Sequence, residues 1–159
     1  MTTEDVEEER ERYRELLEEL RTVIPGVQVL FAFLLTVPFS SRFDALDATS
    51  TQVFAVSLAS VGLATVVLMT PTMYHRLTPR HDRARRIKLG VRVTIAGMAL
   101  LAVAIGASVF VVGKLIFDVN PAARASNLSP TVIGITISAV VAGTAAFLWF
   151  TLPLLRRNR

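Results

Sequence analysis

The chain has 159 residues, of which 52% are hydrophobic and 19% charged, and its mean hydropathy is +0.52. It contains no cysteine, which excludes disulfides, thiolate metal sites and a thiol nucleophile. The net charge of +4 is unevenly distributed, because residues 1–22 carry nine acids against four arginines, a net −5, and the rest of the chain carries +9. These basic residues flank apolar runs, so they indicate membrane topology rather than nucleic-acid binding.

The first expected element is a helix over residues 4–22, ahead of the membrane. The opposite face of this helix is charged. Its apolar residues recur at helical spacing on one face: Val6, Tyr13, Leu16, Leu17 and Leu20. Pro25 and Gly26 predict a kink or a boundary after it. The acidic face argues against binding to anionic lipid, so we expect this helix to pack on protein. The predicted division is a cytoplasmic acidic amphipathic helix, residues 1–22, and a four-helix transmembrane bundle, residues 23–159.

Four apolar runs follow, each near the length of about 20 residues that a helix needs to cross a bilayer. The predicted spans are residues 23–39, 52–74, 91–117 and 131–155. Arg92 and Lys114 are the only charged residues inside these spans, and each lies close to an end of the third. The predicted fold class is therefore all-α, a polytopic membrane protein with four transmembrane helices.

The two remaining loops are short, polar and too small for a separate domain. Residues 40–51 are predicted to hold a surface helical turn, with Phe43 and Leu46 as the only large apolar side chains.

Lys114 and Asp118 lie four residues apart at the end of the third span, a spacing that predicts an ion pair along one helix.

Seven of the 17 Lys and Arg residues lie between the end of the second span and the first turn of the third: Arg76, Arg80, Arg83, Arg85, Arg86, Lys88 and Arg92. With those of the N-terminal segment and the C-terminal tail, fourteen basic residues lie on one side of the predicted membrane and three on the other. The positive-inside rule then predicts a multi-pass protein of the bacterial plasma membrane with both termini in the cytoplasm.

This basic cluster has two interpretations. It acts only as a topology signal, or it is also a docking surface. Near a membrane it would attract anionic headgroups with about 1 kcal/mol per basic residue. It would also attract the acidic residues 1–22, which the topology places on the same side.

Few residues in the spans suggest chemistry. No ionisable residue lies near the middle of a span, where a cation or proton transporter usually needs one. Gln28 is the amide candidate, and we expect an interhelical hydrogen bond from it rather than ligand binding. The hydroxyl candidates are Ser57, Ser60, Thr65, Ser108, Thr136, Ser138 and Thr144. His75 and His81 lack the spacing of one helical face, and no nucleophile or phosphate-binding motif occurs. We expect no enzyme activity, metal or cofactor.

A ridge of small residues in the fourth span predicts close helix packing. Gly134, Ser138, Ala142 and Ala146 recur at intervals of four, which lets two helices approach closely. We expect the partner helix in the same bundle rather than in a second subunit.

Several segments resemble a known family. Residues 15–21 (ELLEELR), 26–36 (GVQVLFAFLLT) and 38–39 (PF), together with 74–77 (YHRL), are similar to a family of small actinobacterial membrane proteins with no assigned function. Beyond Arg92 only the hydropathy is similar. Similar proteins are sometimes described as sodium:proton antiporters, yet no span here supplies a titrating carboxylate. The resemblance implies no catalytic residues.

The leading functional hypothesis is a non-enzymatic membrane protein that acts through helix–helix association, as a homo-oligomer or an accessory subunit. Its expected partners are membrane lipids and either a second copy or another membrane protein, and not nucleic acid. The alternatives are a small oligomeric ion transporter or channel, such as a sodium:proton antiporter, and a protein that responds to anionic lipid.

Overall fold

A computed structural model of the chain describes residues 3–77, 83–119, 129–151 and 155, and the described part is helical. Its elements are α1 (Thr3–Thr36), η1 (Val37–Phe39), η2 (Phe43–Ala45), α2 (Ala48–Leu77), α3 (Arg83–Val119), α4 (Pro130–Ala146) and a short π-helical segment, η4 (Phe147–Thr151). Four stretches are long and apolar enough to cross a membrane: Leu17–Phe39, Ala48–Met73, Leu89–Val119 and Pro130–Thr151. The predicted all-α fold with four helices long and apolar enough to cross a membrane is confirmed for the described residues.

Helix α1 is continuous across the division predicted at residue 22. It runs from Thr3 to Thr36 with Pro25 inside it, so no helix ends at Pro25, and the predicted division lies within one helix. Proline removes one helical hydrogen bond, and the bonds on either side keep the rest of the helix intact. At about 1.5 Å per residue, α1 is about 50 Å long, far more than the roughly 30 Å hydrocarbon core. The acidic residues therefore extend the first membrane helix.

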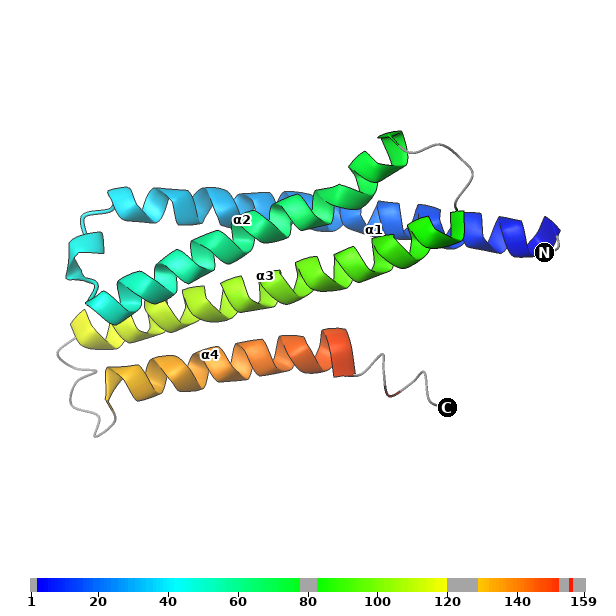
Figure 1. Cartoon of the computed structure of the whole chain (residues 1–159). Helices are drawn as coiled ribbons and strands as arrows, with labels where there is room; N and C mark the ends of the chain where they lie inside the picture. The colour runs from blue at the N-terminus through cyan, green and yellow to red at the C-terminus, as the bar shows by residue number, and fades with distance from the viewer. Residues whose placement is uncertain (1–2, 78–82, 120–128, 152–154, 156–159) are drawn as a thin grey trace.

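The helices run antiparallel in chain order, up and down (Figure 1). Helices α2 and α3 form the centre, α1 packs mainly on α2, and α4 packs mainly on α3. The C-terminal end of α2 and the N-terminal ends of α1 and α3 lie at one end of the molecule, and η1, η2 and the N-terminal end of α4 lie at the other (Figure 1). The acidic half of α1 projects past the start of α3.

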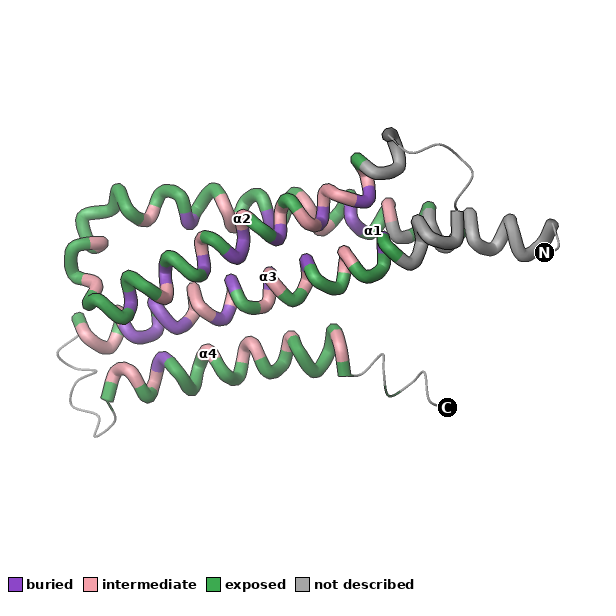
Figure 2. The backbone as a smooth tube through the Cα atoms, viewed as in Figure 1, coloured by how far each residue is buried: buried purple, intermediate pink, exposed green. Residues whose placement is uncertain are grey.

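Burial is concentrated on the three helices α1, α2 and α3 (Figure 2). On α1 the buried residues Leu20, Val27 and Leu34 follow a seven-residue spacing, which keeps one face turned towards α2. Helix α4 is mostly exposed, and Gly134 is its one buried residue. The fourth helix is thus attached to the side of a three-helix core.

The loop turn predicted in residues 40–51 is present as η2. Phe43 packs edge-on against the ring of the buried Phe54, with ring centroids 5.6 Å apart and an interplanar angle of 74°. Leu46 is also partly buried against the core. The two apolar residues of this loop therefore anchor it to the start of α2.

Gly97 permits a close approach between α3 and the Leu68 side chain of α2. A Cβ added to Gly97 would lie 2.6 Å from both Cγ and Cδ2 of Leu68, a residue with 0% exposure. Because this separation is about 1 Å shorter than a normal carbon–carbon contact, only glycine fits unless Leu68 or α2 moves.

Candidate functional site

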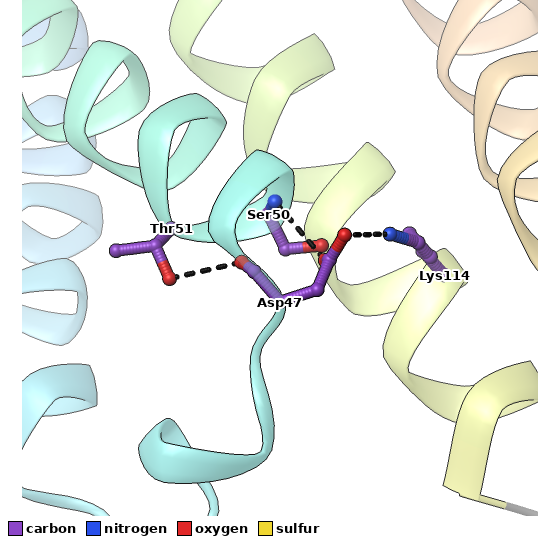
Figure 3. Close-up of polar contacts among 4 residues, drawn as sticks. All are labelled: Asp47, Ser50, Thr51 and Lys114. Carbon is purple, nitrogen blue, oxygen red and sulfur yellow. Dashed lines mark hydrogen bonds and ion pairs between the residues drawn. The ribbon is translucent and has the colours of Figure 1, made fainter.

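An ion pair between a buried lysine and an exposed aspartate joins the start of α2 to α3 (Figure 3). Lys114 Nζ donates to Asp47 Oδ2 at 2.6 Å, and the Lys114 side chain is 9% exposed while that of Asp47 is 47% exposed. Lys114 belongs to the apolar stretch Leu89–Val119, but it lies near its end. Its long side chain carries the ammonium to the carboxylate just outside α2, so the charge is neutralised at the edge of the membrane helices.

Asp47 also caps α2. The Ser50 backbone N–H donates to Asp47 Oδ1 at 3.2 Å, and the Thr51 hydroxyl and N–H both donate to the Asp47 carbonyl at 3.0 Å. The carboxylate therefore satisfies a free N–H at the helix start and lies at its positive end. The hydrogen bond from Lys114, with that from Ser50, lowers the pKa of Asp47 from 3.8 to about 2. Asp47 is charged at any physiological pH.

The ion pair predicted between Lys114 and Asp118 is wrong. Lys114 uses its ammonium on Asp47, which lies 67 positions earlier in the chain. The spacing of four suggests a pair along one helix, whereas the tertiary packing places α2 beside the same amine. The sequence signal for Asp47 was its position a few residues before the second apolar run, where aspartate is a preferred helix cap.

A second polar cluster lies deeper between α2 and α3. Ser57 Oγ lies 2.9 Å from the Ala104 carbonyl and 2.7 Å from Ser108 Oγ, which itself lies 2.9 Å from the same carbonyl. Two hydroxyl hydrogens serve these three contacts, so one hydroxyl donates to the carbonyl while the other donates to its neighbour. Ser57 is 0% exposed, so the cluster is a sealed link between helices.

The small-residue ridge of α4 lies against α3. A Cβ on Gly134 would meet the Phe110 carbonyl oxygen at 3.1 Å and Lys114 Cβ and N at 3.3 Å. The other contacts of the ridge involve Gly106: Ser138 Oγ donates to its carbonyl at 2.7 Å, and a Cβ added there would lie 3.2 Å from Ala142 Cβ. The expected partner within the same chain is therefore present for three ridge residues.

Ala146, the fourth ridge residue, is exposed, whereas its neighbour Ala145 is partly covered. Positions four apart advance by about 40° around a helix, so the fourth lies about 120° from the first. Residues spaced strictly by four therefore rotate off the face that contacts α3 within about three turns.

The other predicted hydroxyls stay within their own helices. Thr65, Thr136 and Thr144 each donate to the carbonyl four residues earlier, at 2.7–2.9 Å. Ser60 is buried at 8% exposure. Thr94 Oγ1 on α3, which the sequence did not single out, is buried and has no hydrogen-bond partner in the part of the chain that the structure describes.

The basic cluster lies on helix ends more than in a loop. Arg76 belongs to the last turn of α2, and Arg83, Arg85, Arg86 and Lys88 belong to the first turns of α3, while Arg80 lies outside the described residues. The side chains of these six residues lie outside the description as well. Arg92 is exposed. The predicted docking of the cluster on lipid or on residues 1–22 stays a prediction.

Gln28 is exposed on α1 and forms no side-chain hydrogen bond within the described residues. The interhelical hydrogen bond that we expected inside the chain is absent from that part. The described residues also contain no group of three His, Asp or Glu side chains able to hold a metal ion.

Comparison with known proteins identifies the family. The model of the family of unknown function DUF6328 matches residues 3–153, which covers all four membrane helices, and the chain belongs to this family. The likeness extends beyond the N-terminal half in which the sequence segments suggested it. No curated protein matches the chain, and neither does any solved structure.

Proposed function

We propose that this protein is a non-enzymatic integral membrane protein that acts through helix–helix association, either as a homo-oligomer or as an accessory subunit of a membrane complex. One observation carries the proposal. The outer faces of α1 and α4 stay exposed, while the buried polar side chains mostly serve contacts among the chain's own helices. Surfaces of α1 and α4 are therefore available for other helices.

The distribution of charge favours association over ion transport. Transport of a proton or cation usually uses an ionisable group near the middle of the membrane, where its protonation and binding can be controlled. In the described residues the buried charge is Lys114, near the end of its span and already paired with Asp47. The pair fixes α2 against α3, which is a structural role.

The proposed topology has both termini in the cytoplasm of a bacterium, with the protein in the plasma membrane. Support comes from the cationic side chains at the first turns of α3, where the positive end of the helix dipole makes them unfavourable for helix stability. Basic residues at a position that is unfavourable for the helix are consistent with a topology signal. Single cysteines in the naturally cysteine-free chain, placed at Thr3 and Ser129 and labelled from either side of the membrane, test this topology.

The test of function is reconstitution in lipid. We expect energy transfer between donor- and acceptor-labelled copies to rise with protein-to-lipid ratio, or a stoichiometric partner to copurify from native membranes. A chain that remains monomeric at every ratio and copurifies with nothing contradicts the proposal. Sodium or proton flux in proteoliposomes above the protein-free background would instead support a transporter. A dependence of assembly on anionic lipid content that is lost on neutralising Arg83, Arg85 and Arg86 would instead support a lipid-responsive protein.

A further inference from the structure

Gln28 occupies an unfavourable position for a lone helix in lipid. It is the central residue of the apolar stretch Leu17–Phe39, and its side chain is exposed. Its amide finds no hydrogen-bond partner in the described residues. Lipid tails offer neither donor nor acceptor, and glutamine at the middle of a span cannot reach the interface as lysine does. A partner outside the chain is needed to satisfy it.

The residues around Gln28 form a second helix-packing seam on α1. Exposed residues recur at alternating intervals of four and three along this face, the spacing of a coiled-coil seam: Arg21, Pro25, Gln28, Ala32 and Leu35. This seam is separate from the face of Leu20, Val27 and Leu34, which contacts the rest of the chain. Ala32 and Pro25 have small side chains next to Gln28, which allows the backbone of another helix to come close.

We propose that a second copy of this chain docks on this seam, with the two Gln28 amides hydrogen-bonded to each other near a two-fold axis. A carboxamide carries both a donor and an acceptor, so across such an axis two copies satisfy one another. Copies inserted in the same orientation bring α1 helices side by side in parallel, and Gln28 then meets itself at the same depth. A polar residue at one seam position also fixes register.

The inference rests on the proposed function, because it names the surface and the partner of the helix association. It selects a second copy over a foreign subunit because the exposed group is self-complementary. Any other occupant would have to present its own polar group at the depth of Gln28.

The experiment uses the full chain in lipid vesicles, where the absence of native cysteine allows single-cysteine variants. Ala32→Cys lies on the seam, one turn from Gln28. Val140→Cys is the matched control, because it is 63% exposed and lies near the middle of its span. Under oxidation, we expect Ala32→Cys to form a disulfide-linked dimer and Val140→Cys to remain monomeric.

Substitution of Gln28 itself supplies the second measurement. Energy transfer during dilution with lipid should give a dimer dissociation constant about tenfold higher for Gln28→Leu, with most of the affinity kept by Gln28→Asn. Because Gln28 is exposed, both variants should retain the helix content of the parent in circular dichroism. An unchanged dissociation constant in Gln28→Leu, or no cross-link at Ala32→Cys, overturns the inference.

The outcomes also separate this inference from the broader proposal. Association that survives Gln28→Leu and cross-links through Val140→Cys removes the Gln28 seam but keeps helix association. A cross-link from Ala32→Cys to a different protein in native membranes overturns the second copy and keeps the accessory-subunit role. A strict monomer without partners removes both.

Discussion

Replacing Gly97 with alanine should weaken the contact between α2 and α3. The added Cβ would lie 2.6 Å from Cγ and Cδ2 of Leu68 and 3.5 Å from Val67 Cγ1. Because carbon atoms prefer about 3.5–4.0 Å, Leu68 or the whole of α2 must move by about 1 Å. Leu68 is 0% exposed, so no free space receives it. Overpacking of this kind costs about 1–3 kcal/mol.

Gly143→Ala is the matched control, because a Cβ there meets no atom within 4 Å. Both variants exchange glycine for alanine inside a helix, so both gain the same intrinsic helix propensity. The measurement is the free energy of unfolding in mixed micelles of rising denaturing-detergent content, followed by circular dichroism. We expect Gly97→Ala to be less stable than Gly143→Ala by about 1–3 kcal/mol.

A double-mutant cycle identifies the clash as the cause. Leu68→Ala removes the atoms that the new methyl group meets, at its own cost of about 2–5 kcal/mol. In that background Gly97→Ala should cost nothing further, because the cavity accepts the methyl group. Equal stability of Gly97→Ala and Gly143→Ala, or additive effects of Gly97→Ala and Leu68→Ala, would refute the reasoning.

Three further predictions concern the polar and glycine contacts. The ion pair with Lys114 lowers the pKa of Asp47 from 3.8 to about 2. The stability advantage of the parent over Asp47→Asn should therefore be complete above pH 3.8 and disappear as the pH falls towards 2. An advantage that persists at pH 2 in unfolding measurements contradicts this. Ser57→Ala should cost about 1 kcal/mol of unfolding free energy. Ser108→Ala should cost less in the Ser57→Ala background than alone, because the two hydroxyls share one carbonyl. Strictly additive losses would contradict this coupling. Gly134→Ala should lower the free energy of unfolding by about 1 kcal/mol relative to Gly143→Ala. This loss should be smaller than that of Gly97→Ala, because α4 lies at the side of the core and can move outward. A larger loss than for Gly97→Ala would contradict the peripheral placement of α4.

Several elements were predictable from the sequence because a single local property determines them. Four apolar runs gave the number of membrane helices, and the spacing of four in the fourth run indicated the face of Gly134, Ser138 and Ala142. The turn around Phe43 followed from its loop composition. Pro25 lies inside the continuous helix α1, because a missing hydrogen bond does not end a helix whose neighbouring bonds are intact.

The candidate site was less predictable because its contacts join distant parts of the chain. Lys114 was noticed, but its partner is 67 positions away, and local spacing favoured Asp118 instead. The serine cluster shares this property, since Ser57 and Ser108 are 51 positions apart. Neither pair leaves a pattern in the residues around it.

The sequence by itself determined that the chain has four helices long and apolar enough to cross a membrane, since the bilayer thickness sets a length and polarity that any spanning segment must meet. Its basic residues also predicted an orientation. Only the tertiary structure decided which faces of those helices are covered. It paired Lys114 with Asp47, placed the Gly134 ridge on α3 and left Gln28 exposed, because each depends on how four helices pack in space.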